Sequence, residues 1–264
     1  TPRQSSRRGH DREVEYPTSD GRPMAETELH ARDMMDLILT LRDHFAADPD
    51  VYAWGNLLIF YEEGSPRKHV SPDVFVVRGV PKEPPRDHYL VWKEGKGPDA
   101  VIEITSKTTR SEDQTKKRAL YRDVLRVPEY FQFDPTEDYL KPPMQGHRLV
   151  DGRYEPIEPV AGRLPSAVLG LHLERDGAEL RLYDPATGRR LLTPRERAAE
   201  AERQAAEAER HAAEAERQAA EALRNATEAA RQAADAKSRA ADVEAENERL
   251  RREIEELRRR TGGA

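Results

Sequence analysis

The sequence predicts an α/β protein in which a mixed β-sheet core with flanking helices is followed by a long C-terminal helix. Two apolar, β-branched runs at residues 71–77 and 99–105 are typical of buried strands in a covered sheet. Apolar residues at helical spacing between Leu29 and Phe45 indicate an amphipathic helix. From Pro194 onward the chain is almost entirely Ala, Glu, Arg and Gln, which favours a continuous helix.

Capping and turn signals complete this order of elements. Thr27 is a suitable N-cap, Pro128 stops a helix, and Asp-Gly pairs are typical of hairpin turns. The expected elements are a helix at 27–47, a hairpin of strands 51–54 and 57–61 around Gly55-Asn56, strands at 71–77 and 99–105, a helix at 111–126, a strand at 129–134, and hairpins at 148–157 and 169–183.

Composition divides the chain into three parts. Residues 1–22 are rich in Arg, Ser, Asp and Gly and have no periodicity, which is typical of a disordered leader. Residues 23–193 hold enough Val, Leu, Ile, Phe and Tyr for one domain with a hydrophobic core. Residues 194–264 form the helical tail.

The tail repeats with a period of seven residues, the pattern of a coiled coil. Two heptad positions, starting at Ala201 and Ala205, are Ala-rich first and carry Val, Leu and Ile towards the C-terminus. Asn247 falls at an a position, where a buried amide favours an in-register, two-stranded arrangement. We therefore expect a homodimer through residues 201–260. A lone solvated helix and a coil with a different partner chain are the alternatives.

Composition also excludes several classes of function. The chain has no cysteine, so it has no disulfide, no thiolate metal site and no cysteine nucleophile. Its net charge is −6, whereas a dedicated DNA-binding protein usually has a basic surplus, so any contact with nucleic acid must be local, weak or bridged by a metal. No apolar stretch approaches the ~18 residues that span a bilayer, so we expect no membrane partner and a cytoplasmic location.

Each of the two apolar runs contains one carboxylate, Asp73 in the first and Glu103 in the second. An ionised carboxylate buried alone is costly, so each acid needs a cation, a proton or a metal. Alternation along the second run puts Glu103 on one face with Val101 and Thr105, while Asp73 follows Pro72 at the start of its strand. On neighbouring strands the two acids could hold Mg²⁺, which prefers oxygen ligands and typically takes one or two carboxylates.

A lysine beside such a metal would stabilise a phosphate or orient the attacking water. The candidates are Lys107, just past the second run, and the lysines of the following helix, Lys117 above all. Helical spacing puts Lys117 on one face with Asp113 and Tyr121. We expect that face to look back at the second acid.

Four motifs follow one another between residues 72 and 135. They are Pro72-Asp73, Glu103-Ile104-Thr105-Ser106-Lys107, Asp113…Lys117…Tyr121, and Val127-Pro128-Glu129-Tyr130-Phe131…Asp134-Pro135. This ordered series resembles the Uma-two family of endonucleases, which belongs to the restriction-endonuclease-like, PD-(D/E)xK superfamily. The resemblance covers about residues 20–183 and includes the segment 24–30.

The resemblance implies a restriction-endonuclease-like fold and an endonuclease that hydrolyses phosphodiester bonds in nucleic acid, with DNA as the expected substrate. It implies Mg²⁺ as the cofactor and Mn²⁺ as a substitute ion. Carried over position by position, Asp73 and Glu103 are the metal ligands. A dimeric coil would pair two such domains, which suits cutting both strands of a duplex.

For the lysine and the accessory acids, this chain departs from the pattern of the superfamily. The superfamily's lysine stands two residues after the second acid, where this chain has Thr105. In this family the lysine has moved to the following helix, which matches Lys117 and leaves Lys107 as the second choice. Glu28 resembles an acid that some superfamily members add to the site, and Asp113 is a further accessory candidate.

Ordinary structural roles are the alternatives for these residues. Asp73 could cap a turn, Glu103 could pair with a basic side chain, and Lys117 could lie on a solvated helix face. The histidines are scattered and lack the spacing of ligands, so none is assigned a role. A second hypothesis for the whole chain is a non-catalytic nuclease-fold module that works through its coiled coil, which the acidic charge and the displaced lysine favour.

Overall fold

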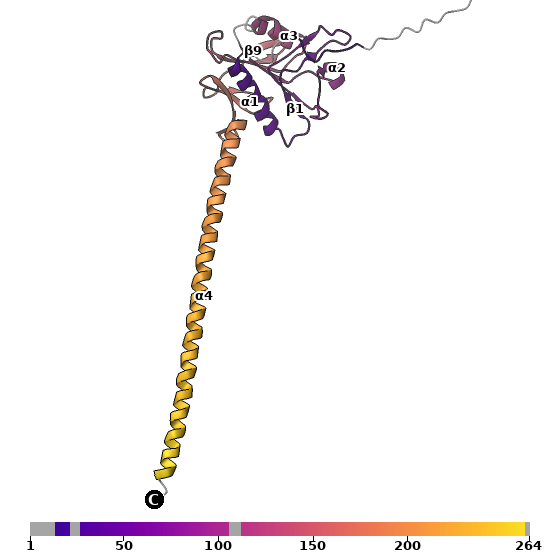
Figure 1. Ribbon diagram of the computed structural model, residues 1–264. Coiled ribbons are helices and arrows are strands. Elements are labelled where there is room, and N and C mark those ends of the chain that lie inside the picture. Colours follow the sequence, from indigo (N-terminus) through magenta and orange to yellow (C-terminus); the bar gives the residue numbers. More distant parts are fainter. Residues whose placement is uncertain (1–13, 22–26, 106–111, 262–264) are drawn as a thin grey trace, which may run out of the picture. The chain divides into compact units, whose positions relative to one another are not determined.

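The computed structural model describes residues 14–21, 27–105 and 112–261. The chain forms two compact units, Thr1–Arg197 and Ala198–Ala264. The described strands all lie in the first unit, and the second unit consists of the continuation of one helix, α4 (Pro194–Thr261; Figure 1). The expected fold class, a mixed sheet core with helices and a long C-terminal helix, is therefore confirmed.

The core of the first unit is a six-stranded sheet in the order β1-β4-β6-β7-β8-β9. Its strands are β1 (Val51–Trp54), β4 (Val74–Arg78), β6 (Ala100–Ile104), β7 (Glu129–Phe133), β8 (Met144–Val150) and β9 (Arg153–Pro156). Neighbouring strands are antiparallel except for β6 and β7, which are parallel. Parallel strands need a crossover connection. Here it contains the helical segments η1 (Glu112–Lys117) and α3 (Arg118–Asp123).

Helix α1 (Glu28–His44) packs on one face of this sheet. It starts at the expected N-cap, Thr27, whose Oγ1 accepts a hydrogen bond from the His30 N–H at 3.1 Å. Helix and strands share one hydrophobic cluster, which includes Met34, Leu37, Leu41, Val74, Val76, Ile102 and Ile104. Because a strand alternates its side chains between two faces, Glu103 projects from the opposite face.

That opposite face is covered by α3 and by a three-stranded sheet in the order β3-β2-β5. The small sheet consists of β2 (Ile59–Phe60), β3 (His69–Val70) and β5 (Tyr89–Leu90), and β5 leads directly into the short helix α2 (Val91–Glu94). The second hydrophobic cluster contains Ile59, Phe75, Tyr89, Val101, Tyr121 and Tyr130. The face that carries Glu103 is therefore closed by aromatic residues.

The expected hairpin around Gly55-Asn56 is wrong. β1 pairs with β4, whereas β2 pairs with β3 and β5. A Cβ atom on Gly55 would lie 2.0 Å from the carbonyl oxygen of Asp73, and the N–H of Asn56 donates to the Pro72 carbonyl at 2.8 Å. The turn is thus fixed by a contact with the segment before β4, and it passes the chain from one sheet to the other.

The two Asp-Gly hairpins are confirmed. One joins β8 to β9, and the other joins β11 to β12. β11 and β12 belong to a four-stranded sheet that consists of β10 (Leu164–Pro165), β11 (His172–Asp176), β12 (Glu179–Asp184) and β13 (Arg189–Arg190). Leu173, Leu180 and Leu182 of this sheet join the hydrophobic cluster of α1, so α1 packs against both sheets.

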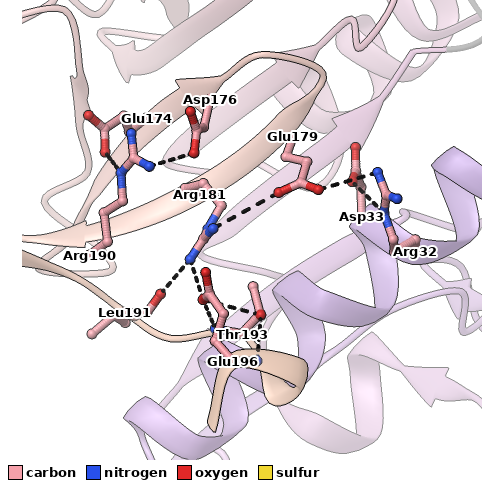
Figure 2. A network of polar contacts seen from close by, with 10 residues as sticks. All are labelled: Arg32, Asp33, Glu174, Asp176, Glu179, Arg181, Arg190, Leu191, Thr193 and Glu196. Carbon is pink, nitrogen blue, oxygen red and sulfur yellow. Dashed lines mark hydrogen bonds and ion pairs between the residues drawn. The ribbon is translucent and has the colours of Figure 1, made fainter. Parts of the chain in front are cut away.

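Charged side chains connect α1, the four-stranded sheet and the first turn of α4 (Figure 2). Arg181 on β12 donates to Glu196 at 2.6 Å and lies 3.9 Å from Glu179, which is 3.4 Å from Arg32 on α1. Thr193 and Glu196 form a capping box: the glutamate accepts from the Thr193 N–H at 2.8 Å, and the Thr193 hydroxyl accepts from the Glu196 N–H at 3.4 Å. Within the first unit, these contacts fix where α4 begins.

Helix α4 is 68 residues long, as a continuous helical tail predicts. Apolar side chains near its C-terminal end are exposed in the single chain, among them Val243, Leu250, Ile254 and Leu257. The coiled coil and the homodimer remain predictions. Neither α4 nor any other helix in the described parts of the chain is apolar enough over a sufficient length to cross a membrane.

Part of the expected leader packs on the domain. The ring of Tyr16 lies 5.0 Å from the ring of Phe60 and 5.3 Å from that of Trp92, measured between centroids. Its hydroxyl accepts a hydrogen bond from the Gly64 N–H at 2.7 Å. Tyr16 thereby covers the hydrophobic cluster around the small sheet.

Candidate active site

Asp73 and Glu103 lie at opposed positions on neighbouring segments of the main sheet. β4 and β6 pair with Val74 opposite Ile102, and the same register continued by one residue places Asp73 opposite Glu103. Opposed side chains of an antiparallel pair have Cβ atoms about 5 Å apart and share one face. The Asp73 carboxylate also accepts a hydrogen bond from the Ile104 N–H at 2.7 Å. The structure therefore brings together the two acids that the sequence singles out.

Glu103 is fully buried, and two side chains of the following helical segments compensate its charge. The ammonium of Lys117 donates to Oε2 at 3.0 Å, and the hydroxyl of Tyr121 donates to Oε1 at 2.6 Å. Lys117 and Tyr121 are four residues apart, so one helix face presents both groups, as their spacing predicts. A buried carboxylate requires such compensation, because an unpaired charge in the interior is strongly destabilising.

Asp73 is held in its ionised form by several neighbours. Burial by itself raises the pKa of this carboxyl, but a hydrogen bond from His30, the positive charge of Lys117 and the Ile104 N–H outweigh it and lower the pKa below its usual value. The Nε2 atom of His30 lies 3.2 Å from Asp73 Oδ1. Lys117 thus acts on both acids: it donates to Glu103 and stabilises the charge of Asp73.

His30 is a member of the site that sequence reasoning missed. It has no second histidine or cysteine at ligand spacing, so its sequence gave no reason to assign it a role. Its helical position was the available signal, because His30 falls on the buried stripe of α1 with Met34, Leu37 and Leu41. A buried polar residue on a helix needs a polar partner, and Asp73 is one for His30.

The other predicted residues do not join this cluster in the described part of the chain. Glu28 is exposed in the first turn of α1, and His30 is the residue of α1 that contacts Asp73 instead. Lys107 lies outside the described residues. Asp113 belongs to η1, but its side chain lies outside the described part as well. The arrangement therefore rests on Asp73, Glu103, Lys117, Tyr121 and His30.

The donor set of this site fits a hard divalent cation. Asp73 and Glu103 supply carboxylate oxygens, and Mg²⁺ typically takes one or two carboxylates and keeps several waters. The described residues contain no group of three or more His, Cys, Asp or Glu side chains arranged to hold a metal. Two opposed carboxylates thus suit Mg²⁺, which completes its shell with water, better than they suit an ion that needs an all-protein cage.

A mixed sheet that brings two carboxylates and a lysine together is compatible with a restriction-endonuclease-like protein. Residues 3–180 match the family model of Uma2, described as "Putative restriction endonuclease". The match spans more than half of the chain, so this chain belongs to the Uma2 family, the Uma-two family that its motifs resemble.

One solved structure similar to this chain is described as "a putative nuclease belonging to DUF820 from Anabaena variabilis ATCC 29413". The two chains share 18% sequence identity with a TM-score of 0.42, and the match covers 56% of this chain and 79% of the other. No curated protein matches the chain. The family assignment therefore rests on the sequence match over residues 3–180.

Proposed function

We propose that this protein is a Mg²⁺-dependent endonuclease that hydrolyses phosphodiester bonds in DNA and accepts Mn²⁺ as a substitute ion. Membership of the Uma2 family supports a nuclease. The observation that carries the finer proposal is the opposed pair Asp73 and Glu103, with Lys117 acting on both. Carboxylates on adjacent strands beside Lys117 suit a reaction that handles a metal ion and a phosphate together.

Each residue has a distinct role in the proposed reaction. Asp73 and Glu103 would hold the ion with their carboxylate oxygens. Bound there, Mg²⁺ would stabilise charge on a phosphoryl oxygen and lower the pKa of a bound water. His30 and the Ile104 N–H keep Asp73 ionised and oriented. The ammonium of Lys117 would turn from compensating Glu103 to stabilising the negative charge of the phosphate.

Removing either carboxylate tests the proposed site. Asp73→Asn and Glu103→Gln are expected to abolish Mg²⁺-dependent cleavage of plasmid DNA and to weaken Mg²⁺ binding in calorimetry. Glu129→Gln is the matched control, because Glu129 is another buried acid. It lies at the start of β7 and pairs at 2.8 Å with Arg148 on β8. The control is expected to lose stability but to keep cleavage. Undiminished cutting by either site variant contradicts the proposal.

We also propose that α4 forms a parallel homodimer through residues 201–260. In a parallel coil, residues at g positions face residues at e positions five places further along the second copy. Glu246 and Glu253 would then face Arg251 and Arg258 of the second copy. The exposed apolar side chains at the C-terminal end of α4 would be buried between the two helices. Two catalytic domains in one assembly suit cleavage of both strands of a duplex.

Charges placed in the heptad seam test this dimer. The double substitution Leu250→Lys and Ile254→Lys is expected to halve the mass measured by sedimentation equilibrium, because two lysines would be buried at d and a positions. Glu255→Lys, at an outward b position, is the control and is expected to leave the mass unchanged. A seam variant that keeps the mass of the wild type contradicts the dimer.

A non-catalytic nuclease-fold module is the second candidate function. The ion pair between Lys117 and Glu103 favours it, because it satisfies the buried acid without a metal. Such a module would bind a partner through residues 201–260 and would cleave neither DNA nor RNA in Mg²⁺ or Mn²⁺. Cleavage by the wild type that Asp73→Asn abolishes excludes this candidate.

A further inference from the structure

Two buried polar atoms near Glu103, on the side chains of Gln132 and Thr105, have no hydrogen-bond partner among the described residues. Gln132 is 2% exposed and Thr105 is 3% exposed. In the described part of the chain, nothing pairs with the Nε2 atom of Gln132 or with the Oγ1 atom of Thr105. An unpaired buried polar group is destabilising, so two such groups near each other indicate an occupant that offers them hydrogen bonds.

The register of the sheet places both groups beside Glu103. β6 and β7 are parallel with Glu103 next to Gln132, and neighbouring strands lie about 4.8 Å apart. Thr105 follows Glu103 by two residues and therefore shares its face. This is the face from which Lys117 and Tyr121 approach Glu103. Gln132 and Thr105 thus flank the buried acid of the candidate site on two sides.

The chemistry of the two groups identifies their occupant. The amide nitrogen of Gln132 only donates, and the hydroxyl of Thr105 both donates and accepts. An amide donor repels a cation, so the occupant is not a metal ion but a molecule with an acceptor oxygen. Since both side chains are at most 3% exposed, a water molecule is the occupant of suitable size. Buried waters typically make two to four hydrogen bonds to polar groups of this kind.

We propose that Gln132 and Thr105 bind a water molecule beside Glu103 and orient it for attack on the phosphodiester, which makes both of them positioning residues. This proposal rests on the proposed endonuclease function. In that step the water oxygen forms a bond to phosphorus, and the bond between phosphorus and the leaving sugar oxygen breaks with its electron pair. The attacking water loses one proton to solvent, and the leaving oxygen gains one from solvent.

Substitutions that keep shape but remove the polar groups test the proposal. Gln132→Met and Thr105→Val are expected to lower kcat about 10-fold to 100-fold at unchanged KM, the size typical of outer partners that orient a reacting group. Thr105→Ser keeps the hydroxyl and is expected to have the kcat of the wild type. Gln145→Met is the matched control, because Gln145 pairs with Gln132 across β7 and β8 but donates to the Pro142 carbonyl at 3.1 Å.

A crystal structure of the full-length chain without metal gives a second measurement that does not depend on activity. A water within hydrogen-bond distance of Gln132 Nε2 and Thr105 Oγ1, absent in Gln132→Met, supports the proposal. A wild-type structure with no water at this position overturns the proposal. Variants that change only the free energy of unfolding, with kcat unchanged, also overturn it, because the groups would then be merely structural. A wild type without cleavage overturns the proposed function and the positioning role together, whereas an active wild type with unaffected variants overturns the positioning role alone.

Discussion

Asp33 is a buried aspartate on helix α1 and Asp73 is a half-buried aspartate that contacts the same helix, but the pKa values of the two carboxyls shift in opposite directions. Loss of water raises the pKa of Asp33 to about 7: the Arg32 guanidinium, 4.0 Å away, opposes this only in part, and the charge of Glu179 adds to it. Burial acts on Asp73 in the same direction. There the hydrogen bond from His30 and the charge of Lys117 outweigh it, and the pKa of Asp73 is lowered.

The difference shows what separates a structural acid from a candidate ligand in this domain. Asp33 has an Oδ2 atom that no described residue satisfies. In Asp73, by contrast, Oδ1 lies 3.2 Å from Nε2 of His30 and Oδ2 accepts a hydrogen bond from the Ile104 N–H. A metal ligand must be deprotonated, so only an acid that the fold keeps ionised is ready to bind a cation. Burial alone would raise the pKa of Asp73, as it does for Asp33. The surrounding donors therefore distinguish Asp73 from Asp33, and four substitutions test this comparison.

The largest effect on stability is expected from Lys117→Met, which removes the ammonium that donates to the fully buried Glu103. Breaking a buried ion pair on one side typically costs about 3–5 kcal/mol, so we expect a loss of about 3 kcal/mol in the free energy of unfolding measured with urea at pH 7. Lys116→Met is the control, because Lys116 is exposed next to it. A loss below about 1 kcal/mol would show that the buried Glu103 does not depend on Lys117.

Asp33→Asn is expected to have the next largest effect, a stabilisation whose size increases with pH. The folded state keeps a proton on Asp33 up to about pH 7, while the unfolded chain loses it near pH 3.8. The folded state therefore binds more protons between these values, and its stability falls as the pH rises through them. The asparagine variant lacks this loss and is expected to be more stable than the wild type by on the order of 2 kcal/mol at pH 8.

Asp73→Asn is the control for Asp33→Asn, because its effect on stability is expected to have the opposite sign. The lowered pKa of Asp73 means that its ionised form stabilises the fold above pH 3.8, and this contribution is lost as the pH falls through the folded pKa. Asp73→Asn is therefore expected to destabilise the protein at pH 8, where Asp33→Asn stabilises it. Urea unfolding of both variants between pH 4 and pH 8 measures the difference. The same sign for both would remove the distinction between the two aspartates.

Local patterns in the sequence were sufficient for much of the fold and part of the site. The β-branched runs predicted β4 and β6, which are neighbours and bring Asp73 opposite Glu103. The four-residue spacing of Lys117 and Tyr121 predicted a single helix face towards Glu103, and both side chains contact it. These features depend on strand alternation and helical periodicity, which are properties of short segments.

Features that depend on contacts between distant segments were not predictable in this way. Gly55 was interpreted as part of a hairpin turn because its close approach to the Asp73 carbonyl is invisible in the sequence. His30 received no role because its partner, Asp73, is 43 residues away in the chain and meets it only when α1 packs on the sheet. The buried position of Gln132 beside Glu103 likewise requires the parallel pairing of β6 with β7. Long-range packing, rather than local propensity, sets these contacts.

The smallest effect is expected from Glu196→Ala at the start of α4, which removes both the capping box with Thr193 and the ion pair with Arg181 (Figure 2). We expect a loss of about 1 kcal/mol in the free energy of unfolding, typical of a lost helix cap. Glu200→Ala, one turn later on α4, is the control.

The ion pair of Arg181 and Glu196 tests whether burial or distance sets the strength of an ion pair in this domain. Arg181 and Glu196 are 2.6 Å apart and Lys117 and Glu103 are 3.0 Å apart, but Glu196 is 40% exposed and Glu103 is 0% exposed. Water screens the shorter pair, so its loss is expected to cost less than the loss of the longer one. Equal losses in Glu196→Ala and Lys117→Met would mean that burial does not set the strength of these ion pairs. In that case the buried donors around Asp73 and Glu103 would not distinguish these acids from exposed ones.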